Sequence, residues 1–345
     1  MMDKQTQSQP TQVGILGFGF MGRTHATAYQ SAHREGHHCN LAMIADPNLN
    51  ALQSTQTTGN IEQDQSQLDL SNTKLTQDPA DIINEPAIDL ISICTHTDTH
   101  VDLAIQALNA GKHVLIEKPI AIRSSDVQRL VSAAKDASTL CIPAMCMRHW
   151  PAWVKIHECI HSKTFGRVRS AAFHRLGSRP NWSTDFYADD TRSGGVLHDL
   201  HIHDTDFIVH CFGTPNAVTT VGDHLHLTTL YHYDSDEHPI HITAQAAWDH
   251  QPSVGYRMRC TIVCEHATLD FDFSAEHQLV IHQGDESTPV NLSPLSGYDA
   301  EIRWMLDQIN TNSITHRPIH DALMVAQVLE AEARSITSNT RVQLS

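Results

Sequence analysis

A carboxylate, an amine and a proline follow one another in the stretch HVLIEKPI, residues 113–120. The first four residues read as a short buried strand, so Glu117 and Lys118 leave its carboxyl end, where parallel sheets bind ligands. Pro119 lacks an N–H group and favours an extended conformation at Lys118. Neighbours on a strand point to opposite faces, which disfavours a simple surface ion pair between Glu117 and Lys118. Lys118 is therefore a candidate to meet a cofactor and a substrate.

A second group of reactive side chains lies in the glycine-led stretch GGVLHDLHIHDTD, residues 194–206. Asp199 and His203 are four residues apart and share one face of a helix. A carboxylate beside an imidazole holds one tautomer and raises its basicity, which prepares a general base. The alternative is an Asp–His pair with no catalytic role. The histidines match no zinc signature, and Lys118 would repel a cation, so we expect no metal site.

A glycine-rich turn joins the first apolar strand, residues 12–18, to a segment with helical spacing, residues 20–32. A helix N-terminus offers free N–H groups and a partial positive charge to a pyrophosphate. Asp46 ends the second apolar strand, where a carboxylate binds ribose hydroxyls and repels a 2′-phosphate. The alternative is a turn without a ligand. We expect NAD, with NADP less favoured, to contact Asp46 and the GxGxxG residues Gly17, Phe18, Gly19, Phe20, Met21 and Gly22.

Strands and helices alternate along the first part of the chain. Further apolar strands are expected at 41–46, 88–95, 113–118 and 140–146, and helices at 78–86, 98–112 and 124–136. Such alternation predicts a doubly wound parallel sheet that is covered on both faces. We assign residues 12–146 to a Rossmann dinucleotide-binding domain and treat residues 1–11 as a loose tail.

The pattern changes after residue 147. Helices are expected at 151–166, 193–213, 297–310 and 319–338, and alternating, strand-like runs fill 168–177 and much of 217–291. This pattern predicts a large, mostly antiparallel open sheet with one buried face. We assign residues 147–345 to a C-terminal α/β domain for substrate binding and oligomerisation, and its helix at about 319–338 is expected to pack back on the Rossmann domain.

Composition narrows the choice of partners. The chain has 23 Lys and Arg against 39 Asp and Glu, a net charge of −16 with neutral histidines, which disfavours nucleic acid and anionic membranes. The eight cysteines form no CxxC pair, so a zinc ribbon or a dithiol redox motif is not supported. No apolar run reaches 18 residues, and the N-terminal residues lack a signal-peptide pattern. We expect a reduced, cytoplasmic protein.

Taken together, these motifs resemble those of the glucose–fructose oxidoreductase / inositol dehydrogenase / rhizopine-catabolism (Gfo/Idh/MocA) family. The resemblance rests on the GxGxxG turn, Asp46, the stretch CTHTDTHVDLAIQALNAGKHVLIEKPIA (94–121) and the stretch SGGVLHDLHIHDTDF (193–207). It covers about residues 12–338. It implies a Rossmann domain, a C-terminal α/β domain whose open sheet often builds a homodimer or homotetramer, a nicotinamide cofactor, and sugar or cyclitol substrates.

The resemblance also implies roles for residues by position. Lys118 would bind the substrate and the cofactor ribose, and Asp199 and His203 would face the substrate, with His203 as acid and base. His96 stands where the family commonly has proline, and His201 stands where glycine is frequent, so a bulkier pocket wall is expected. The other residues expected to line the cofactor site are Thr95, His96, His100, Glu117 and Arg148.

The function that we expect is a reversible oxidation of a secondary hydroxyl of a sugar, sugar derivative or cyclitol. His203 would take the proton, Asp199 would stabilise the imidazolium, and Lys118 would hydrogen-bond the oxygen. One alternative is tightly retained NAD, used transiently for glycoside cleavage or epimerisation. Another is a non-catalytic dinucleotide-binding regulator. Substrate contacts are expected from Arg148, Trp150, Trp182 and Tyr187, with Trp153 and Phe186 as further aromatic candidates, although core packing is the alternative for these rings.

Overall fold

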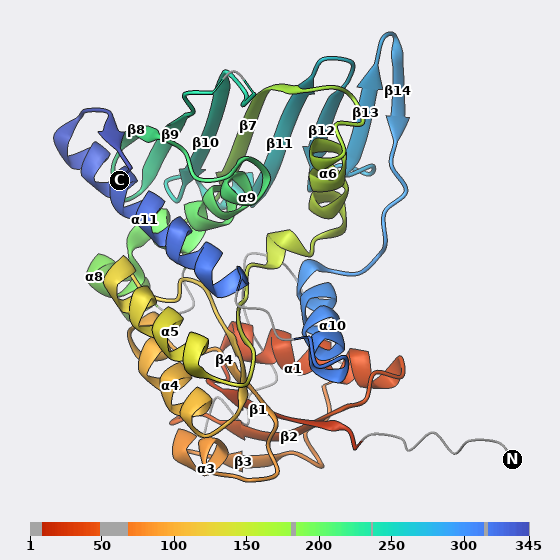
Figure 1. Ribbon diagram of the computed structural model, residues 1–345, viewed down its shortest axis with the longest axis vertical. Helices are drawn as coiled ribbons and strands as arrows, with labels where there is room; N and C mark the ends of the chain where they lie inside the picture. Colours follow the sequence, from red (N-terminus) through yellow and green to blue (C-terminus); the bar gives the residue numbers. More distant parts are fainter. Residues whose placement is uncertain (1–8, 49–67, 181–183, 236, 314–316, 345) are drawn as a thin grey trace, which may run out of the picture.

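The computed structural model describes residues 9–48, 68–180, 184–235, 237–313 and 317–344. Two sheets organise these residues (Figure 1), one of six strands and one of nine. Trp182, expected to contact substrate, lies outside the described residues.

The six-stranded sheet is wholly parallel and has the order β3-β2-β1-β4-β5-β6. This order is that of the dinucleotide-binding fold, so the predicted fold class of the first part of the chain is confirmed. The strands are β1 (Thr11–Leu16), β2 (Cys39–Ala45), β3 (Lys74–Thr76), β4 (Leu90–Ile93), β5 (His113–Ile116) and β6 (Cys141–Pro143).

Alternate residues of these strands enter two separate apolar clusters, one on each face of the sheet. Ile15 and Leu115 pack with α1 (Phe20–Arg34) and α10 (Gly297–Asn310). Leu16 and Ile116 belong to the larger cluster on the other face. That face is covered by the helices α3 (Pro79–Ile83), α4 (Thr97–Asn109), α5 (Ser124–Asp136) and α11 (Arg317–Ser338). The two last helices of the chain thus complete both faces of the first sheet.

The nine-stranded sheet has the order β14-β13-β12-β11-β7-β10-β9-β8-β15. All of its pairings are antiparallel except that of β10 with β7. Its strands are β7 (Val168–Leu176), β8 (Ala217–Gly222), β9 (His226–His232), β10 (His241–Ala247), β11 (Arg257–Cys264), β12 (Thr268–Asp272), β13 (Leu279–Gln283), β14 (Glu286–Pro289) and β15 (Val342–Gln343). The predicted, mostly antiparallel open sheet is confirmed.

Helices α6 (Pro151–His161) and α9 (Ile202–Phe212) pack on one face of this sheet. Trp153 of α6 is fully buried and meets three phenylalanine rings, with centroids 4.6 Å from Phe207, 5.9 Å from Phe173 and 5.7 Å from Phe271. Such aromatic packing supplies much of the core of a sheet-and-helix layer. Trp153 is therefore a core residue, as its alternative interpretation held.

The helix expected at 193–213 is divided in the structure. Two short helices, α7 (Thr184–Ala188) and α8 (Asp190–Ser193), come first, and a π-helical turn, Leu197–His201, precedes α9. Gly194 and Gly195 have φ values of 73° and 62°, and two consecutive left-handed residues cannot continue a right-handed helix. The residues of the second motif therefore sit on a wide turn rather than inside one regular helix.

The last two helices connect the two sheets (Figure 1). Helix α10 contacts α1, while α11 contacts α5 beside the first sheet as well as α9 and β8 beside the second. Within the described ranges, no helix combines the length and the apolar character that crossing a bilayer requires.

Candidate active site

A cavity of about 1090 Å³, called here the central cavity, opens at the carboxyl ends of β1, β2, β4 and β5. Its opposite wall comes from α7, α8, the π turn and the residues Tyr256 and Tyr298. The structure brings together here most of the predicted site residues: Gly17, Phe18, Gly19, Phe20, Met21, Asp46, Thr95, His96, His100, Glu117, Lys118, Tyr187, Asp199 and His203. Gly22, Arg148 and Trp150 do not line it.

The glycine turn after β1 leaves room for a ligand at one position. Gly17 has φ 87°, and a side chain there would lie 2.6 Å from the carbonyl oxygen of Cys94. A side chain at Gly22 would lie 2.0 Å from the carbonyl oxygen of Gly17, so Gly22 serves the packing of α1 against the turn. Apart from its neighbours along the chain, no atom of the described residues lies within 4 Å of the Cβ position of Gly19. An open backbone at the N-terminus of α1 fits the pyrophosphate of a dinucleotide.

Asp46 is fixed beside this turn by backbone groups. The Phe18 N–H donates to its Oδ2 at 2.7 Å, and the Asn48 N–H donates to its Oδ1 at 2.8 Å. A carboxylate has further lone pairs that can accept from ribose hydroxyls. Arg23 lies over the Phe18 ring at 4.3 Å, and burial lowers its pKa while Asp46 raises it. The sequence around Asp46 contains no arginine, so only the fold brings Arg23 to this carboxylate.

Lys118 is held by two groups of Asp199. Its Nζ donates to Asp199 Oδ1 at 2.9 Å and to the backbone carbonyl of Asp199 at 2.8 Å. Burial by itself would lower the pKa of Lys118, but the carboxylates of Asp199 and Glu117 raise it above its usual value. The Lys118 side chain is therefore a charged hydrogen-bond donor, aimed into the cavity by Asp199. The Lys118–Pro119 peptide bond is cis.

Glu117 points away from Lys118 into the interior, as the alternation along a strand predicts. Its Oε1 lies 3.0 Å from Nε2 of His25, and its Oε2 accepts from the Lys118 backbone N–H at 3.0 Å. His25 Nδ1 continues to the Ser92 hydroxyl at 3.3 Å, which lies 2.8 Å from the Tyr29 hydroxyl. This buried chain of polar groups joins β4, β5 and α1. No spacing in the sequence indicates it, because the bonded pairs are 63 to 92 residues apart.

His203 lines the cavity and is half-buried, and its Nδ1 is buried without a hydrogen-bond partner. Burial, and then the positive charges of Lys118 and Arg175, hold the pKa of His203 well below 6.5. The imidazole is therefore neutral near pH 7 and can accept a proton. Instead of the expected pairing with His203, the Asp199 carboxylate accepts from Lys118 Nζ at 2.9 Å, and no hydrogen bond joins Asp199 to His203 among the described residues.

A buried ion pair underlies this wall of the cavity. Arg175 of β7 donates to Asp204 at 2.7 Å and to the Tyr256 hydroxyl at 2.9 Å, and Arg175 and Asp204 are each 1% exposed. Tyr256 lines the cavity and is fixed by this contact. The charge of Arg175 also lowers the pKa of His203. Arg175 could not be found from the sequence, because a single arginine in an alternating strand carries no functional signal.

Four residues, which we call the clasp, join the start of α4 to α7 and α8 across the cavity: His96, Asp98, Phe186 and Arg192. The His96 and Phe186 rings stack at 4.6 Å. Arg192 donates to Asp98 at 3.0 Å and lies 5.5 Å from the Phe186 ring. Burial and the charge of Arg192 lower the pKa of His96. A proline at position 96 could form neither the stack nor the contact with Arg192.

His100 supports the site from behind. Its Nδ1 lies 2.9 Å from the carbonyl oxygen of Pro119, and its Nε2 lies 2.9 Å from that of Thr95. Burial lowers the pKa of His100, so the neutral ring can donate to only one carbonyl at a time. His100 therefore ties the segment after β4 to the segment after β5.

Arg148 and His201, which were expected at the cofactor or substrate site, do not line the central cavity. Arg148 donates to both carboxylate oxygens of Asp206, at 2.7 and 2.9 Å, and to Asp321 at 2.9 Å. The prediction that Arg148 contacts cofactor or substrate does not fit, because two carboxylates engage its guanidinium. His201 does not make the wall of the central cavity bulkier, since its ring is fully buried on the other side of the π turn.

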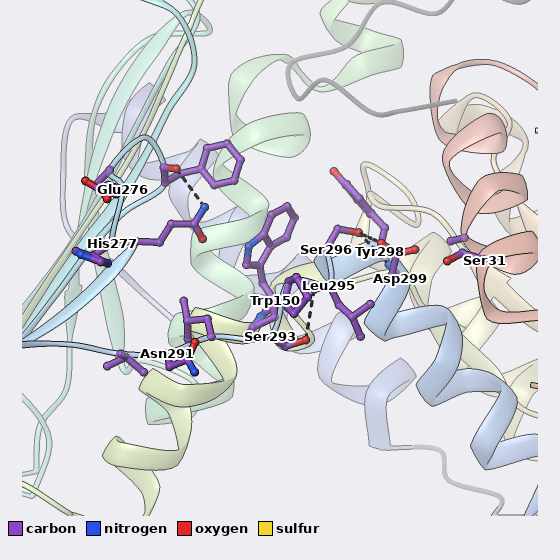
Figure 2. Close-up of a pocket in the computed structure, with 18 of the residues that line it drawn as sticks. Ser31, Trp150, Glu276, His277, Asn291, Ser293, Leu295, Ser296, Tyr298 and Asp299 are labelled. Carbon is purple, nitrogen blue, oxygen red and sulfur yellow. Dashed lines mark hydrogen bonds between the residues drawn. The ribbon is translucent and has the colours of Figure 1, made fainter. Parts of the chain in front are cut away.

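Trp150 lines a second cavity, of about 860 Å³, on the α10 side of the molecule. Figure 2 shows Trp150 between the β12–β13 turn, which carries Glu276 and His277, and the segment that carries Ser296 and Asp299. Ser296 and Asp299 bond each other. Neither Lys118 nor His203 reaches this space, so the predicted substrate contact of Trp150 does not fit the central cavity.

Comparison with known protein families gives two matches. Residues 11–145 match the model described as "Oxidoreductase family, NAD-binding Rossmann fold", and residues 153–270 match the GFO/IDH/MocA C-terminal domain. Together the two models cover most of both sheets.

Among curated proteins, the chain is similar to myo-inositol 2-dehydrogenase of Thermotoga maritima, with 29% identity over 203 residues, 59% of this chain and 55% of that protein. It is also similar to levoglucosan dehydrogenase of Pseudarthrobacter phenanthrenivorans, with 27% identity over 223 residues, 62% of this chain and 54% of that protein. The chain thus spans about half the length of the curated relatives that it matches.

Among solved structures, levoglucosan dehydrogenase in complex with NADH and levoglucosan has a TM-score of 0.80 at 19% identity. The match covers 97% of this chain and all of that one. GenD2 from gentamicin A biosynthesis, in complex with NAD, has a TM-score of 0.79 at 18% identity, and that match covers 100% of this chain and 99% of that one. At these identities the likeness describes a shared fold.

Proposed function

We propose, from the premise that this chain belongs to the Gfo/Idh/MocA oxidoreductase family, that it transfers a hydride between a secondary hydroxyl of a sugar, sugar derivative or cyclitol and NAD. One observation carries the proposal. The charged Lys118 and the neutral His203 line the same cavity as the open glycine turn and Asp46. When bound, NAD would supply the hydride acceptor. The names of the similar proteins, an inositol and a levoglucosan dehydrogenase, support the substrate class.

The side chains of this cavity have separate tasks in the proposed reaction. His203 accepts the proton of the substrate hydroxyl, for which a neutral imidazole is required. Lys118 donates a hydrogen bond to the same oxygen and stabilises the negative charge that develops there. Asp199 keeps Lys118 charged and oriented, a task that replaces the expected one of stabilising a protonated His203.

For cofactor binding, we assign the pyrophosphate to the open backbone at Gly19 and the adenosine ribose to Asp46. The carboxylate of Asp46 favours the free 2′-hydroxyl of NAD over the 2′-phosphate of NADP. Arg23, near the same carboxylate, is the residue that would moderate this preference. Thr95, His96 and Glu117 complete the proposed cofactor wall, with His100 behind it.

The reaction is tested by following absorbance at 340 nm after adding NAD and a panel of cyclitols, aldoses, anhydrosugars and amino sugars. We expect a rise with one substrate class, faster with NAD than with NADP. No rise with any of these substrates, in protein that carries no bound nucleotide, would contradict the proposal. Nucleotide analysis of the denatured protein should accompany the assay, because the clasp gives a specific reason to consider retained NAD. Bound nucleotide without net NADH formation would favour the transient-hydride alternative.

Substitution of Lys118 tests the role of its ammonium. Lys118→Ala should lower kcat by about 10²- to 10³-fold, the usual cost of losing one donor to a developing oxyanion, while the Kd for NAD changes little. Steady-state kinetics and NADH fluorescence titration measure the two quantities. Lys155→Ala, at a half-exposed lysine of α6, is the matched control. Unchanged turnover in Lys118→Ala would remove Lys118 from the mechanism.

We also propose that the chain forms a homodimer or homotetramer through the outer face of the nine-stranded sheet. That face exposes residues of β7, β9, β10 and β11 that point away from α6 and α9. Light scattering after size exclusion measures the mass directly. A monomer at micromolar concentration would contradict this part of the proposal.

A further inference from the structure

Helix α11 contacts the two parts of the chain that supply the catalytic pair. Lys118 follows β5, whereas Asp199 lies in the π turn, 81 residues further along. Helix α11 contacts α5, which follows Lys118 in the chain, and it also contacts the π turn and α9 (Figure 1). Two glutamates of α11, Glu330 and Glu332, make polar contacts in these two directions.

Glu330 holds the segment that follows Lys118. Its Oε1 accepts from the Ser124 backbone N–H at 2.7 Å, and its Oε2 accepts from the Ser124 hydroxyl at 2.8 Å. Ser124 is the first residue of α5, so Glu330 satisfies a free N–H at this helix N-terminus, where a negative charge is also favourable. This double contact holds the α5 end of residues 119–123, which lie between Lys118 and α5, while His100 Nδ1 lies 2.9 Å from the Pro119 carbonyl oxygen at the other end.

Glu332 holds the segment that follows Asp199. It is fully buried. Its Oε2 lies at an ion-pair distance of 3.3 Å from Nε2 of His201, the last residue of the π turn, without forming a hydrogen bond, and its Oε1 accepts from the Thr205 hydroxyl at 3.5 Å. The Tyr231 hydroxyl lies 3.1 Å from the same nitrogen and 2.8 Å from the Thr205 hydroxyl. Burying a carboxylate and an imidazole is costly, and apolar residues of similar volume would often be as stable. The best-known role of such buried polar pairs is to specify one geometry.

Asp199 lies in the π turn, and Lys118 bonds two groups of that residue. Its ammonium donates to the side-chain carboxylate at 2.9 Å and to the backbone carbonyl at 2.8 Å. The backbone contact depends on the course of the main chain, so a shift of the π turn would break it even with Asp199 unchanged. π turns are rare and frequently lie at functional sites.

We propose that Glu330 and Glu332 are positioning residues that set the distance between Lys118 and Asp199, one from each side. Glu330 fixes the segment after Lys118, and Glu332 fixes the π turn through His201 and Tyr231. The expected effect of these glutamates on kcat rests on the proposed function. Their expected effect on the contact between Lys118 and Asp199 does not, because the protonation of the Lys118 amine can be measured without any substrate.

The first measurement is the acylation rate of Lys118 by an N-hydroxysuccinimide ester, followed by peptide mass spectrometry with Lys155 as internal standard. An amine reacts only when it is deprotonated, and Asp199 keeps Lys118 protonated. Glu332→Gln and Glu330→Ala should each raise the Lys118 rate by about fivefold or more, because one lost pKa unit gives about tenfold more free amine. Arg334→Gln, at an exposed residue of the same helix, should leave it unchanged.

The second measurement is the pH profile of kcat. In Glu332→Gln and Glu330→Ala we expect kcat to fall about 10- to 100-fold, the cost of a misplacement near 1 Å, with an alkaline limb at lower pH than in the wild type. The Kd for NADH should stay within about twofold, since the main contacts of α11 are with α5, α9 and β8, whereas the glycine turn and Asp46 follow β1 and β2. Glu330→Gln, which keeps an acceptor for Ser124, should recover most of kcat.

Tyr231→Phe is the milder variant if Glu332→Gln does not fold, since it removes only the hydroxyl beside His201. Folded variants with wild-type acylation rates at Lys118 would overturn the inference. If the wild type forms no NADH with any substrate, the proposed function fails, and the acylation rates still decide the positioning role. If Glu332→Gln and Glu330→Ala lose kcat while the acylation rate of Lys118 and the pH profile stay as in the wild type, the two glutamates have a merely structural role. That result would also overturn the inference.

Discussion

Lys118 shows how one side chain acquires its chemistry from its neighbours. Burial alone would lower its pKa, and the carboxylates of Asp199 and Glu117 reverse that effect. The backbone carbonyl of Asp199 then fixes the direction of the ammonium. His203, on the same cavity wall, has its pKa lowered by burial and by the charge of Lys118. The two groups thus hold opposite protonation states at neutral pH, one a donor and the other an acceptor.

The cofactor preference can be tested at Asp46. Asp46→Ser should raise the Kd for NAD about 10- to 100-fold, because a charge-assisted bond to the ribose is lost along with the support of the Phe18 N–H. Discrimination against NADP should shrink, since the repelling charge is gone. NADH and NADPH fluorescence titrations give both constants. Asp136→Ser, at an exposed carboxylate that ends α5, serves as control, and an unaltered NAD affinity in Asp46→Ser would refute the ribose assignment.

The pH dependence of the reaction belongs to His203. Its pKa is well below 6.5, so the imidazole stays neutral, and able to accept a proton, as pH falls from 8 through 6.5. We expect kcat/KM to show no acid limb between pH 8 and 6.5. It should fall only below pH 6.5, as the His203 ring becomes protonated. A profile of kcat/KM against pH between 4.5 and 9 measures this limb. An acid limb centred above pH 7 would show that another group is the base.

Residues whose meaning is local were within reach of the sequence. Lys118 and Asp46 each end an apolar strand, and that position alone indicates the ligand-binding edge of a parallel sheet. Arg175 and His25 were out of reach, because their partners Asp204 and Glu117 are brought to them only by folding. The bonds of Arg148 to Asp206 and Asp321 were out of reach for the same reason, since nothing local in the sequence shows these carboxylates.

At the scale of elements, the segment from α8 to α9 carries most of the difference between expectation and structure. Helical spacing over 193–213 correctly indicates that the region is helical. It does not reveal that Gly194 and Gly195 both adopt left-handed conformations or that a π turn follows. Hydrophobic periodicity averages over several turns, whereas one inserted residue changes the direction of the next side chains. The pairing of Asp199 with Lys118 depends on that detail.

The clasp is an element-scale prediction about cofactor release. Arg192→Gln removes the ion pair with Asp98 and the contact with the Phe186 ring, together worth about 1 kcal/mol. The dissociation rate of NADH should therefore rise about fivefold. Stopped-flow displacement of NADH measures this rate. Arg123→Gln breaks an exposed pair with Asp126 on α5 and should have no effect, while an unchanged rate in Arg192→Gln would show that the clasp does not retain the cofactor.

For the whole molecule, the pattern of apolar residues in the sequence predicts the two sheets but does not predict how they are joined. The pairing of β10 parallel to β7 and the packing of α10 on α1 connect residues that are far apart in the chain. Periodicity identifies a buried face without naming what covers it. Helix α11 has such a face, and in the structure it is shared between α5 and α9. Contacts of this kind are decided by the packing of the complete core.

The histidines make a prediction about the stability of the whole protein. Burial is the leading cause of a lowered pKa in seven of those that the structure describes: His96, His100, His113, His149, His198, His203 and His232. For such a group the unfolded chain binds the proton first, so the free energy of unfolding falls as pH drops below 6.5 toward the folded pKa.

His149 makes this effect measurable at one position. Burial and the charge of Arg148 lower its pKa from 6.5 to about 4, so it should cost about 2 kcal/mol of stability at pH 5 compared with pH 7.5. His149→Phe, which keeps a ring beside Trp304, should remove that share of the loss. Urea unfolding of both proteins at the two pH values gives the comparison, with the exposed His277→Asn as control. Equal acid losses in wild type and His149→Phe would show that His149 titrates normally in the folded protein, and that the acid sensitivity arises elsewhere.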